Sequence, residues 1–257
     1  MDIDTVRSYL SRIGAPTPAG PTVEVLRDLH RRHLETVPFE NLSIHLGEPI
    51  VLTADALVDK IVRRGRGGFC YELNGLFAEL LRALGFEVEL LAASVLVDGG
   101  RIVTPIFDHL AVLVRLEERH LVDVGFGVHA TYPLRLDWPE AQGDPAGEFL
   151  VVDGPGGDMD VLMDGVPQYR VELRPRSLPD FERPCWWQQT APGSHFRDTP
   201  RCSRNTENGR VTIVGDRLLE TVGEHRTETT LTTDEEILSA YEKHFGFRLP
   251  RVPTPPA

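Results

Sequence analysis

The sequence has few cysteines and no long hydrophobic run. Its 257 residues contain 3 cysteines, Cys70, Cys185 and Cys202, and no CxxC pair. A sparse, odd set argues against a disulfide framework or a cysteine zinc site and is typical of a reducing compartment. No uninterrupted run of about 18 apolar residues is present, so we predict no transmembrane helix and no membrane partner. We also predict no metal site.

Basic residues are fewer than acidic ones, 27 Lys and Arg against 39 Asp and Glu, which gives a net charge of −12. We therefore expect no general affinity for nucleic acid or anionic membranes. The opening residues MDID are acidic and lead into an amphipathic pattern, unlike a secretory signal peptide. With the cysteine pattern, this predicts a cytoplasmic protein. The local exception is a basic loop at residues 63–66.

The chain is organised around residues 63–84. Residues 63–68 form a basic, glycine-rich loop, and from Tyr71 apolar residues recur at offsets of three and four until Gly85. This pattern predicts a buried helix over 71–84 with Cys70 at its entrance. The N-terminal end of a helix favours a thiolate, so Cys70 is a candidate nucleophile. The alternative is a small buried hydrophobic residue.

Apolar periodicity divides the chain into three regions. The first, 1–85, is helical, the second, 86–178, has short strands with a turn about every ten residues, and the third, 179–257, mixes both. This predicts an α+β protein whose middle region is an antiparallel barrel or sandwich. The expected elements are helices 3–13, 22–34, 53–64 and 71–84, strands 86–97, 107–116, 120–124, 148–153, 160–163 and 168–173, a hairpin turn at 98–100, a short helix around Trp186, strands 210–214 and 226–231, and a helix 234–244.

Two histidines, His30 and His33, lie three residues apart on the second predicted helix. That spacing is compatible with a metal site, but no third ligand is evident nearby. We therefore expect a solvated or capping role for both. Residues 37–42 are interpreted as a turn with an apolar anchor.

Polar residues interrupt two apolar strands of the middle region. The strand 106–114 is apolar except at Asp108 and His109, and Asp123 ends the next apolar strand. A turn centred near residue 118 would place His109 opposite Gly127, with contact to Asp123 if a bulge shifts the register. A buried carboxylate requires a partner, and His109 would supply it. The alternative is a purely structural Asp–His pair.

Cys70, His109 and Asp123 together fit the logic of a nucleophile, its base and the group that orients the base. The motifs that carry them are RGGFCYELN at 66–74, DHL at 108–110 and DVGFG at 123–127, preceded by PFEN at 38–41 and followed by SHF at 194–196 and NGRVTI at 208–213. In this order they resemble the arylamine N-acetyltransferase family, bacterial type. The resemblance covers nearly the whole chain.

The resemblance implies a helical bundle (1–85) that carries the nucleophile, a β-barrel (86–178) that carries His109 and Asp123, and an α/β lid (179–257). The core would resemble that of cysteine proteases. The implied reaction is ping-pong acyl transfer from acetyl-CoA through an acetyl-Cys70 thioester. The acceptor would be an arylamine, an arylhydrazine or an arylhydroxylamine. Acetyl-CoA would be a substrate, with no permanently bound cofactor, and the oligomeric state stays open.

Five further residues are candidates for ligand contacts. Gly125 and Gly127 lie in GFGVHA, which has the spacing of a phosphate-binding loop for CoA; the alternative is a tight turn that brings Phe126 to the pocket. Phe39, Phe126 and Phe196 are candidates for an apolar pocket for the aromatic substrate, although each could be core, Phe39 most readily.

Other activities are compatible with the same triad. An amide synthase that closes a macrolactam from a carrier-bound polyketide would use the same three residues, and the sequence does not separate it from amine acetylation. The RGGFCYELN stretch argues against a papain-like thiol hydrolase. An inactive ligand-binding relative is disfavoured because all three triad positions are intact.

Overall fold

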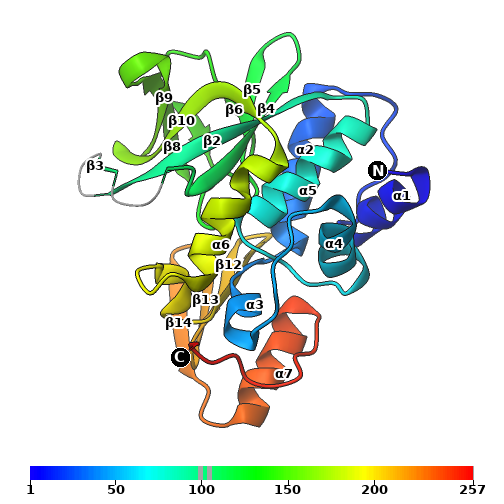
Figure 1. Ribbon diagram of the computed structural model, residues 1–257, viewed down its shortest axis with the longest axis vertical. Coiled ribbons are helices and arrows are strands. Elements are labelled where there is room, and N and C mark those ends of the chain that lie inside the picture. Colours follow the sequence, from blue (N-terminus) through cyan, green and yellow to red (C-terminus); the bar gives the residue numbers. More distant parts are fainter. Residues whose placement is uncertain (98–100, 103–105, 257) are drawn as a thin grey trace.

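In the computed structural model, most helices lie in the first third of the chain, and two antiparallel sheets with two further α-helices make up the rest (Figure 1). The structure describes residues 1–97, 101–102 and 106–256. The helices are α1 (Ile3–Arg12), α2 (Val23–Thr36), α3 (Leu42–Leu46), α4 (Ala54–Leu57) with a π-helical continuation (Val58–Arg63), α5 (Cys70–Ala83), α6 (Glu182–Thr190) and α7 (Asp234–Phe245). None of these described helices has the length and apolar character needed to cross a bilayer.

The strands form two separate sheets. They are β1 (Phe39–Glu40), β2 (Glu87–Val97), β3 (Arg101–Ile102), β4 (His109–Arg115), β5 (Arg119–Val122), β6 (Leu134–Arg135), β7 (Gln142–Asp144), β8 (Gly147–Asp153), β9 (Met159–Met163), β10 (Val166–Arg176), β11 (Arg201–Thr206), β12 (Gly209–Val214), β13 (Arg217–Val222) and β14 (His225–Thr230).

Helix α5 is the centre of the main hydrophobic core. Its residues Leu73, Leu76 and Phe77 are fully buried, and strands β2 and β4 pack against the helix. The helix predicted at 71–84 is therefore confirmed, with Cys70 as its first residue. Its entrance is fixed by Glu72, whose carboxylate accepts the backbone N–H of Phe69 at 3.2 Å. This bond pairs one N–H group that the helix itself leaves without a partner.

A buried ionic network lies beneath this entrance. The Lys60 ammonium lies 2.7 Å from Glu72, and the Arg66 guanidinium lies 2.9 Å from Glu40. All four side chains are at most 7% exposed, so each charge depends on its partner. The network ties α5 to the π-helical segment and to β1. It therefore fixes the position of the loop that leads into Cys70.

The larger sheet is strongly curved and nearly closes on itself. Its strand order is β6-β5-β4-β2-β10-β9-β8-β7, with β3 paired to β2. At the two edges, the Gln142 side chain accepts the backbone N–H of Arg135 at 2.7 Å and donates to its carbonyl at 3.0 Å. These bonds bridge β6 and β7, so the antiparallel barrel predicted for the middle region is confirmed in this barrel-like form. The predicted turn at 98–100 lies outside the described residues.

The register of β4 and β5 differs from the one expected. Arg115 pairs with Arg119 and Val112 with Val122, so the turn is centred on residue 117 and not 118. The shift places Asp123 directly after the paired strand, one step diagonal from His109. No bulge is needed to bring them together, which corrects the sequence-based register.

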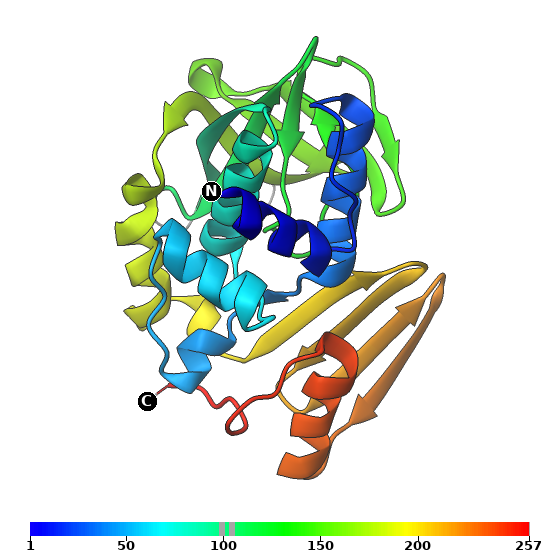
Figure 2. The same cartoon turned by 90° about the vertical axis from the view of Figure 1, so that its right-hand side faces the viewer.

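The smaller sheet has the order β1-β11-β12-β13-β14. Figure 2 shows α7 lying against one face of it, where the helix packs on apolar strand residues. Residues 39–40 join this sheet, because Phe39 pairs with Ser203. The interpretation of 37–42 as a turn is therefore wrong: β1 and α3 occupy this stretch. The buried apolar residues of this face and helix are Cys202, Val211, Ile213, Leu218, Ala240, Tyr241 and Phe245.

The buried network predicts a large loss of stability on removing its cation. Lys60→Met leaves the Glu72 carboxylate buried without its 2.7 Å partner. We expect the free energy of unfolding to fall by roughly 3–5 kcal/mol, because an unpaired buried charge keeps its desolvation cost. The loss should shrink at acidic pH, since burial raises the pKa of Glu72 and the protonated acid needs no cation. Urea denaturation at several pH values measures both effects.

The matched control is Arg82→Met, which removes the more exposed pair between Arg82 and Glu79 on the same helix. Its cost should stay below about 1 kcal/mol. Equal losses for the two variants would show that the buried network does not hold α5 in place.

Candidate active site

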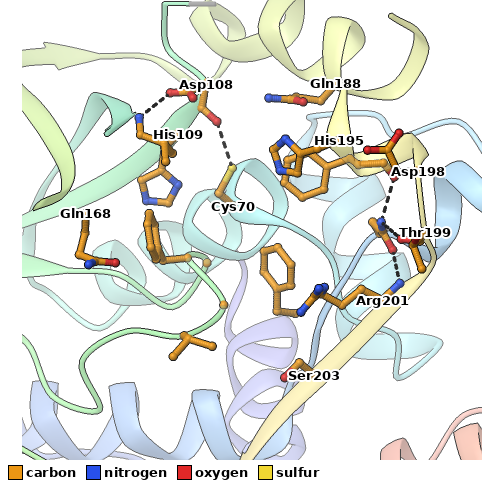
Figure 3. A pocket seen from close by; sticks show the side chains of 18 of the residues that line it. Cys70, Asp108, His109, Gln168, Gln188, His195, Asp198, Thr199, Arg201 and Ser203 are labelled. Carbon is orange, nitrogen blue, oxygen red and sulfur yellow. Dashed lines mark hydrogen bonds between the residues drawn. The ribbon is translucent and has the colours of Figure 1, made fainter. Parts of the chain in front are cut away.

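A cavity of about 640 Å³ opens between the N-terminal end of α5, the larger sheet and the smaller sheet (Figure 3). It contains seven of the eight residues proposed from the sequence, and Asp123 lies behind His109 at 3% exposure. The structure therefore brings the candidate nucleophile, its candidate base and the aromatic residues to one cavity. The seven lining residues are Phe39, Cys70, His109, Gly125, Phe126, Gly127 and Phe196.

Cys70 begins α5 and is only 3% exposed. Its thiol donates a long hydrogen bond of 3.9 Å to the Asp108 carbonyl. Burial raises the pKa of the Cys70 thiol, and the negative charge of Asp123 adds to this effect, while the Leu110 backbone N–H lowers it. Burial therefore opposes the thiolate that the N-terminal end of the helix favours.

His109 and Asp123 form a direct pair. The His109 Nε2 atom lies 2.7 Å from Asp123 Oδ2, and both side chains are almost fully buried. Figure 3 shows the imidazole beside Cys70 at the cavity wall. Burial raises the pKa of Asp123, but the charge and hydrogen bond of His109 outweigh it, so the net pKa is well below its ordinary value. An ionised Asp123 accepts the Nε2 proton, which leaves Nδ1 to act as the base.

Asn74 ties the nucleophile helix to the segments that carry the other two triad residues. Its amide donates to the Leu110 carbonyl at 2.6 Å and to Asp123 Oδ1 at 2.8 Å, while its oxygen accepts the Val124 N–H at 2.8 Å. Asn74 belongs to the RGGFCYELN motif, but the sequence alone assigns it no role. Its position one turn after Cys70, on the same helix face, is the signal that could have identified it.

Gly125 allows the same segments to approach closely. A Cβ atom at this position would lie 2.7 Å from the Cys70 Cα and 2.9 Å from the Asn74 amide nitrogen. The Gly125 N–H also donates to Asp123 Oδ1 at 3.0 Å. This contact accounts for a glycine here whether or not the loop binds CoA. No helix begins within residues 124–133, so the loop lacks the helix N-terminus of a typical phosphate-binding motif.

His30 supports Asp123 from the opposite side. Its Nε2 accepts the Asp123 backbone N–H at 3.3 Å, and its Nδ1 lies 2.8 Å from the Thr131 carbonyl. Burial lowers the pKa of His30, consistent with a neutral ring. His33 is also buried, against Tyr9 and Phe77. The expectation of solvated or capping histidines is therefore wrong for both, because α2 turns this face toward the core.

A second histidine, His129, lies in an aromatic cluster behind His109. Its Nε2 is 3.2 Å from the Tyr169 hydroxyl, and its ring centroid is 5.2 Å from that of Phe126. Phe126 in turn meets the His109 ring edge-on at 5.1 Å. Burial lowers the pKa of His129 to about 4, so its ring is neutral near pH 7. The sequence does not reveal that His129 is buried.

The PFEN motif builds the wall of the cavity opposite His109. Phe39 is half-buried and lines the cavity; its ring centroid lies 6.3 Å from that of Phe196. Asn41 holds the segment that carries Phe196: its amide donates to the carbonyls of Phe196 and Thr199 at 2.9 and 3.0 Å. The cavity therefore has an aromatic lining fixed by a polar clamp.

Comparison with known proteins agrees with this geometry. A family model described as N-acetyltransferase matches residues 22–253. The arylamine N-acetyltransferase of Mycolicibacterium smegmatis is 34% identical over 254 residues, which cover 94% of this chain and 91% of that protein.

Two solved structures extend the comparison to three dimensions. The arylamine N-acetyltransferase from Salmonella typhimurium matches with a TM-score of 0.89 at 30% identity, covering 96% of this chain and 92% of that one. The Mycobacterium marinum arylamine N-acetyltransferase in complex with CoA matches with a TM-score of 0.85 at 30% identity, covering 94% and 92%. The chain therefore belongs to the N-acetyltransferase family that includes the arylamine N-acetyltransferases.

Proposed function

We propose that this protein transfers the acetyl group of acetyl-CoA to the nitrogen of an arylamine or arylhydrazine, or to the oxygen of an arylhydroxylamine, through an acetyl-Cys70 thioester. The observation that carries the proposal is a thiol at the wall of an aromatic cavity beside the His109–Asp123 pair. The relatives named as arylamine N-acetyltransferases and the CoA complex of the M. marinum protein support the reaction class.

In the resting enzyme His109 Nδ1 holds the Cys70 proton, and in the first half-reaction the Cys70 thiolate attacks the thioester carbonyl of acetyl-CoA. Backbone N–H groups at the start of α5 stabilise the oxyanion, except that of Glu72, which already donates to the Phe69 carbonyl at 3.0 Å. The tetrahedral intermediate then collapses with cleavage of the bond to the CoA sulfur. The CoA thiolate takes the proton back from the imidazolium and leaves as the free thiol. The acetyl group remains on Cys70.

In the second half-reaction, the acceptor amine attacks the acetyl carbon. Phe39, Phe126 and Phe196 would hold its aromatic ring in the cavity. His109 takes a proton from the attacking nitrogen and returns it to the Cys70 sulfur as the thioester breaks. Asp123 stabilises the imidazolium in both halves, in the manner of a cysteine-protease core. For CoA, we propose that the loop of Gly125 and Gly127 contacts the thioester end of the donor, because Gly125 lies directly against Cys70.

The first prediction concerns the acyl-enzyme. Mixing the protein with acetyl-CoA without an amine should add one acetyl group, about 42 Da, at Cys70, because the thioester forms before the acceptor binds. Intact-protein mass spectrometry detects it. Steady-state assays with a small aromatic amine should then give parallel double-reciprocal lines. Cys70→Ala should lose both the adduct and turnover, and Cys185→Ala is the matched control.

Two results would contradict this prediction. If Cys70→Ala acetylates an arylamine at the wild-type rate, Cys70 is not the nucleophile. Failure to acetylate any small amine, together with cyclisation of a thioester-activated amino-polyketide, would make macrolactam formation the activity of the same triad.

Replacing Asp123 with asparagine tests the orienting role. The side-chain oxygen can still accept from Asn74 and Gly125, so its NH₂ would face His109 Nε2. That arrangement forces the ring proton onto Nδ1, and kcat should fall on the order of a hundredfold or more. Stopped-flow acetylation rates measure the effect.

The control for this variant is Asp144→Asn. Asp144 accepts backbone N–H groups of Thr131, Tyr132 and Ala146 but does not line the cavity. Asp144→Asn therefore measures how the loss of a partly buried carboxylate affects folding when the cavity itself is unchanged. A near-normal rate in correctly folded Asp123→Asn would make Asp123 structural.

The ionisation of Cys70 is testable by alkylation. In the wild type, iodoacetamide labelling should persist at about pH 6, below the free-cysteine pKa of about 8.5, because His109 holds the thiol proton. In His109→Gln the profile should shift upward by more than one pH unit, since burial and Asp123 both raise the pKa of the thiol. Buried Cys185 and Cys202 should label slowly throughout. An ordinary thiol profile in both proteins would exclude the ion pair.

A further inference from the structure

One face of the smaller sheet is polar and lines the cavity. Every second residue of β11 lies on that face, namely Arg201, Ser203 and Asn205. Arg210 of β12 lies on the same face, because it pairs with Asn205 in the antiparallel register. The opposite face carries Cys202 and packs against α7, as described above. Three of these polar residues, Arg201, Ser203 and Arg210, line the cavity. Figure 3 shows Arg201 and Ser203 on the side away from His109.

Arg210 is held in place but its charge is not neutralised. Its guanidinium donates to Ser203 Oγ at 2.8 Å and to Asn205 Oδ1 at 2.5 Å, both uncharged acceptors. These bonds use two of the guanidinium N–H groups and leave others for a ligand. Within the described chain, no carboxylate forms an ion pair with Arg210 or Arg201. Asp198 lines the same cavity, but it is exposed and unpaired with either arginine.

Arg210 is half-buried beside the exposed Arg201, so two like charges lie in the same part of the cavity. Burial lowers the pKa of Arg210 to about 10, and the positive charge of Arg201 adds to the effect. Elsewhere in the part of the chain that the structure describes, the buried Arg66 lies against the Glu40 carboxylate. Arg210 instead has a neighbour of the same charge. A planar guanidinium with free N–H groups binds carboxylates and phosphates in a bidentate manner, and an incoming anion would relieve both penalties.

We propose that Arg210, assisted by Arg201, is an anion-binding site of the cavity that holds a negatively charged group of one substrate while its reacting end lies at Cys70. The group is a carboxylate on the aromatic acceptor or a phosphate on the acyl donor. What reacts at Cys70 rests on the proposed function. The anion site itself rests on the geometry of the smaller sheet.

The test compares charged and neutral substrates in Arg210→Met. On the acceptor side, p-aminobenzoate is compared with p-aminobenzamide at saturating acetyl-CoA. On the donor side, acetyl-CoA is compared with S-acetylpantetheine, which has no phosphate. We expect KM to rise about tenfold or more for the charged member of one pair and to change less than about twofold for its neutral counterpart. Arg210→Lys should recover part of the loss, because it keeps the charge without the planar fork.

Arg217→Met is the matched control, since Arg217 lies on the same sheet but is exposed and pairs with Glu228. It should change none of the four KM values. Isothermal titration of p-aminobenzoate, p-aminobenzamide and CoA into wild type and Arg210→Met gives a readout that needs no turnover. If Arg210→Met binds an anion more weakly than the wild type does, and the wild type acetylates no substrate, the anion site is supported and the proposed reaction is wrong.

The results of these measurements either identify the group that binds at Arg210 or overturn the proposal. Weaker binding or a higher KM for p-aminobenzoate alone identifies an acceptor carboxylate. The same change for acetyl-CoA and CoA alone identifies a donor phosphate. Three results would overturn the proposal. They are equal changes in KM for the charged and neutral substrates, unchanged KM values for all four, and no measurable binding of any anion to the wild type.

Discussion

The buried Asp123 carboxylate imposes the constraint on which the site depends. A charge removed from water must be paired, and here the partners come from three parts of the chain. His109 donates from the start of β4, Asn74 from α5, and Gly125 from Asp123's own segment. Satisfying one carboxylate therefore aligns the base with the helix that carries the nucleophile. The catalytic geometry and the packing of helix on sheet have the same cause.

Burial also explains why the thiol needs its base. A thiol in water would ionise near its ordinary pKa, but Cys70 is buried and close to Asp123, and both effects oppose a thiolate. The helix dipole contributes only about 0.3–1 kcal/mol, too little to offset them. In the proposed reaction the proton therefore moves to His109, whose cation Asp123 stabilises. Burial penalises an isolated Cys70 thiolate but favours a thiolate paired with the His109 cation, because fixed partners stabilise both charges where water is excluded.

The triad and the nucleophile helix are predictable from the sequence, because each is encoded by local pattern: glycines and a basic loop before Cys70, helical periodicity after it, and apolar strands broken by His109 and Asp123. What the sequence does not reveal depends on tertiary neighbours. The burial of His30 follows from the packing of α2, and that of His129 from the aromatic cluster around Tyr169. Strands β11 and β13 escape prediction because a polar residue interrupts the face that carries their buried apolar residue, Arg204 beside Cys202 in β11 and Glu220 beside Leu218 in β13. The one-residue error in the β4–β5 turn arises because a turn centre is set by hydrogen bonding and not by composition.

The PFEN motif shows how one short segment can serve the core and the cavity together. Phe39 faces the cavity, Glu40 pairs with Arg66 beneath the nucleophile loop, and Asn41 clamps the segment that carries Phe196. Alternation along β1 sends Phe39 and Glu40 to opposite faces of the smaller sheet. Gly67 completes the arrangement, because a Cβ there would lie 1.9 Å from the Pro38 carbonyl oxygen. The aromatic wall thus forms only where the smaller sheet docks against the nucleophile loop, so the acceptor pocket and the thiol cannot be positioned independently of each other.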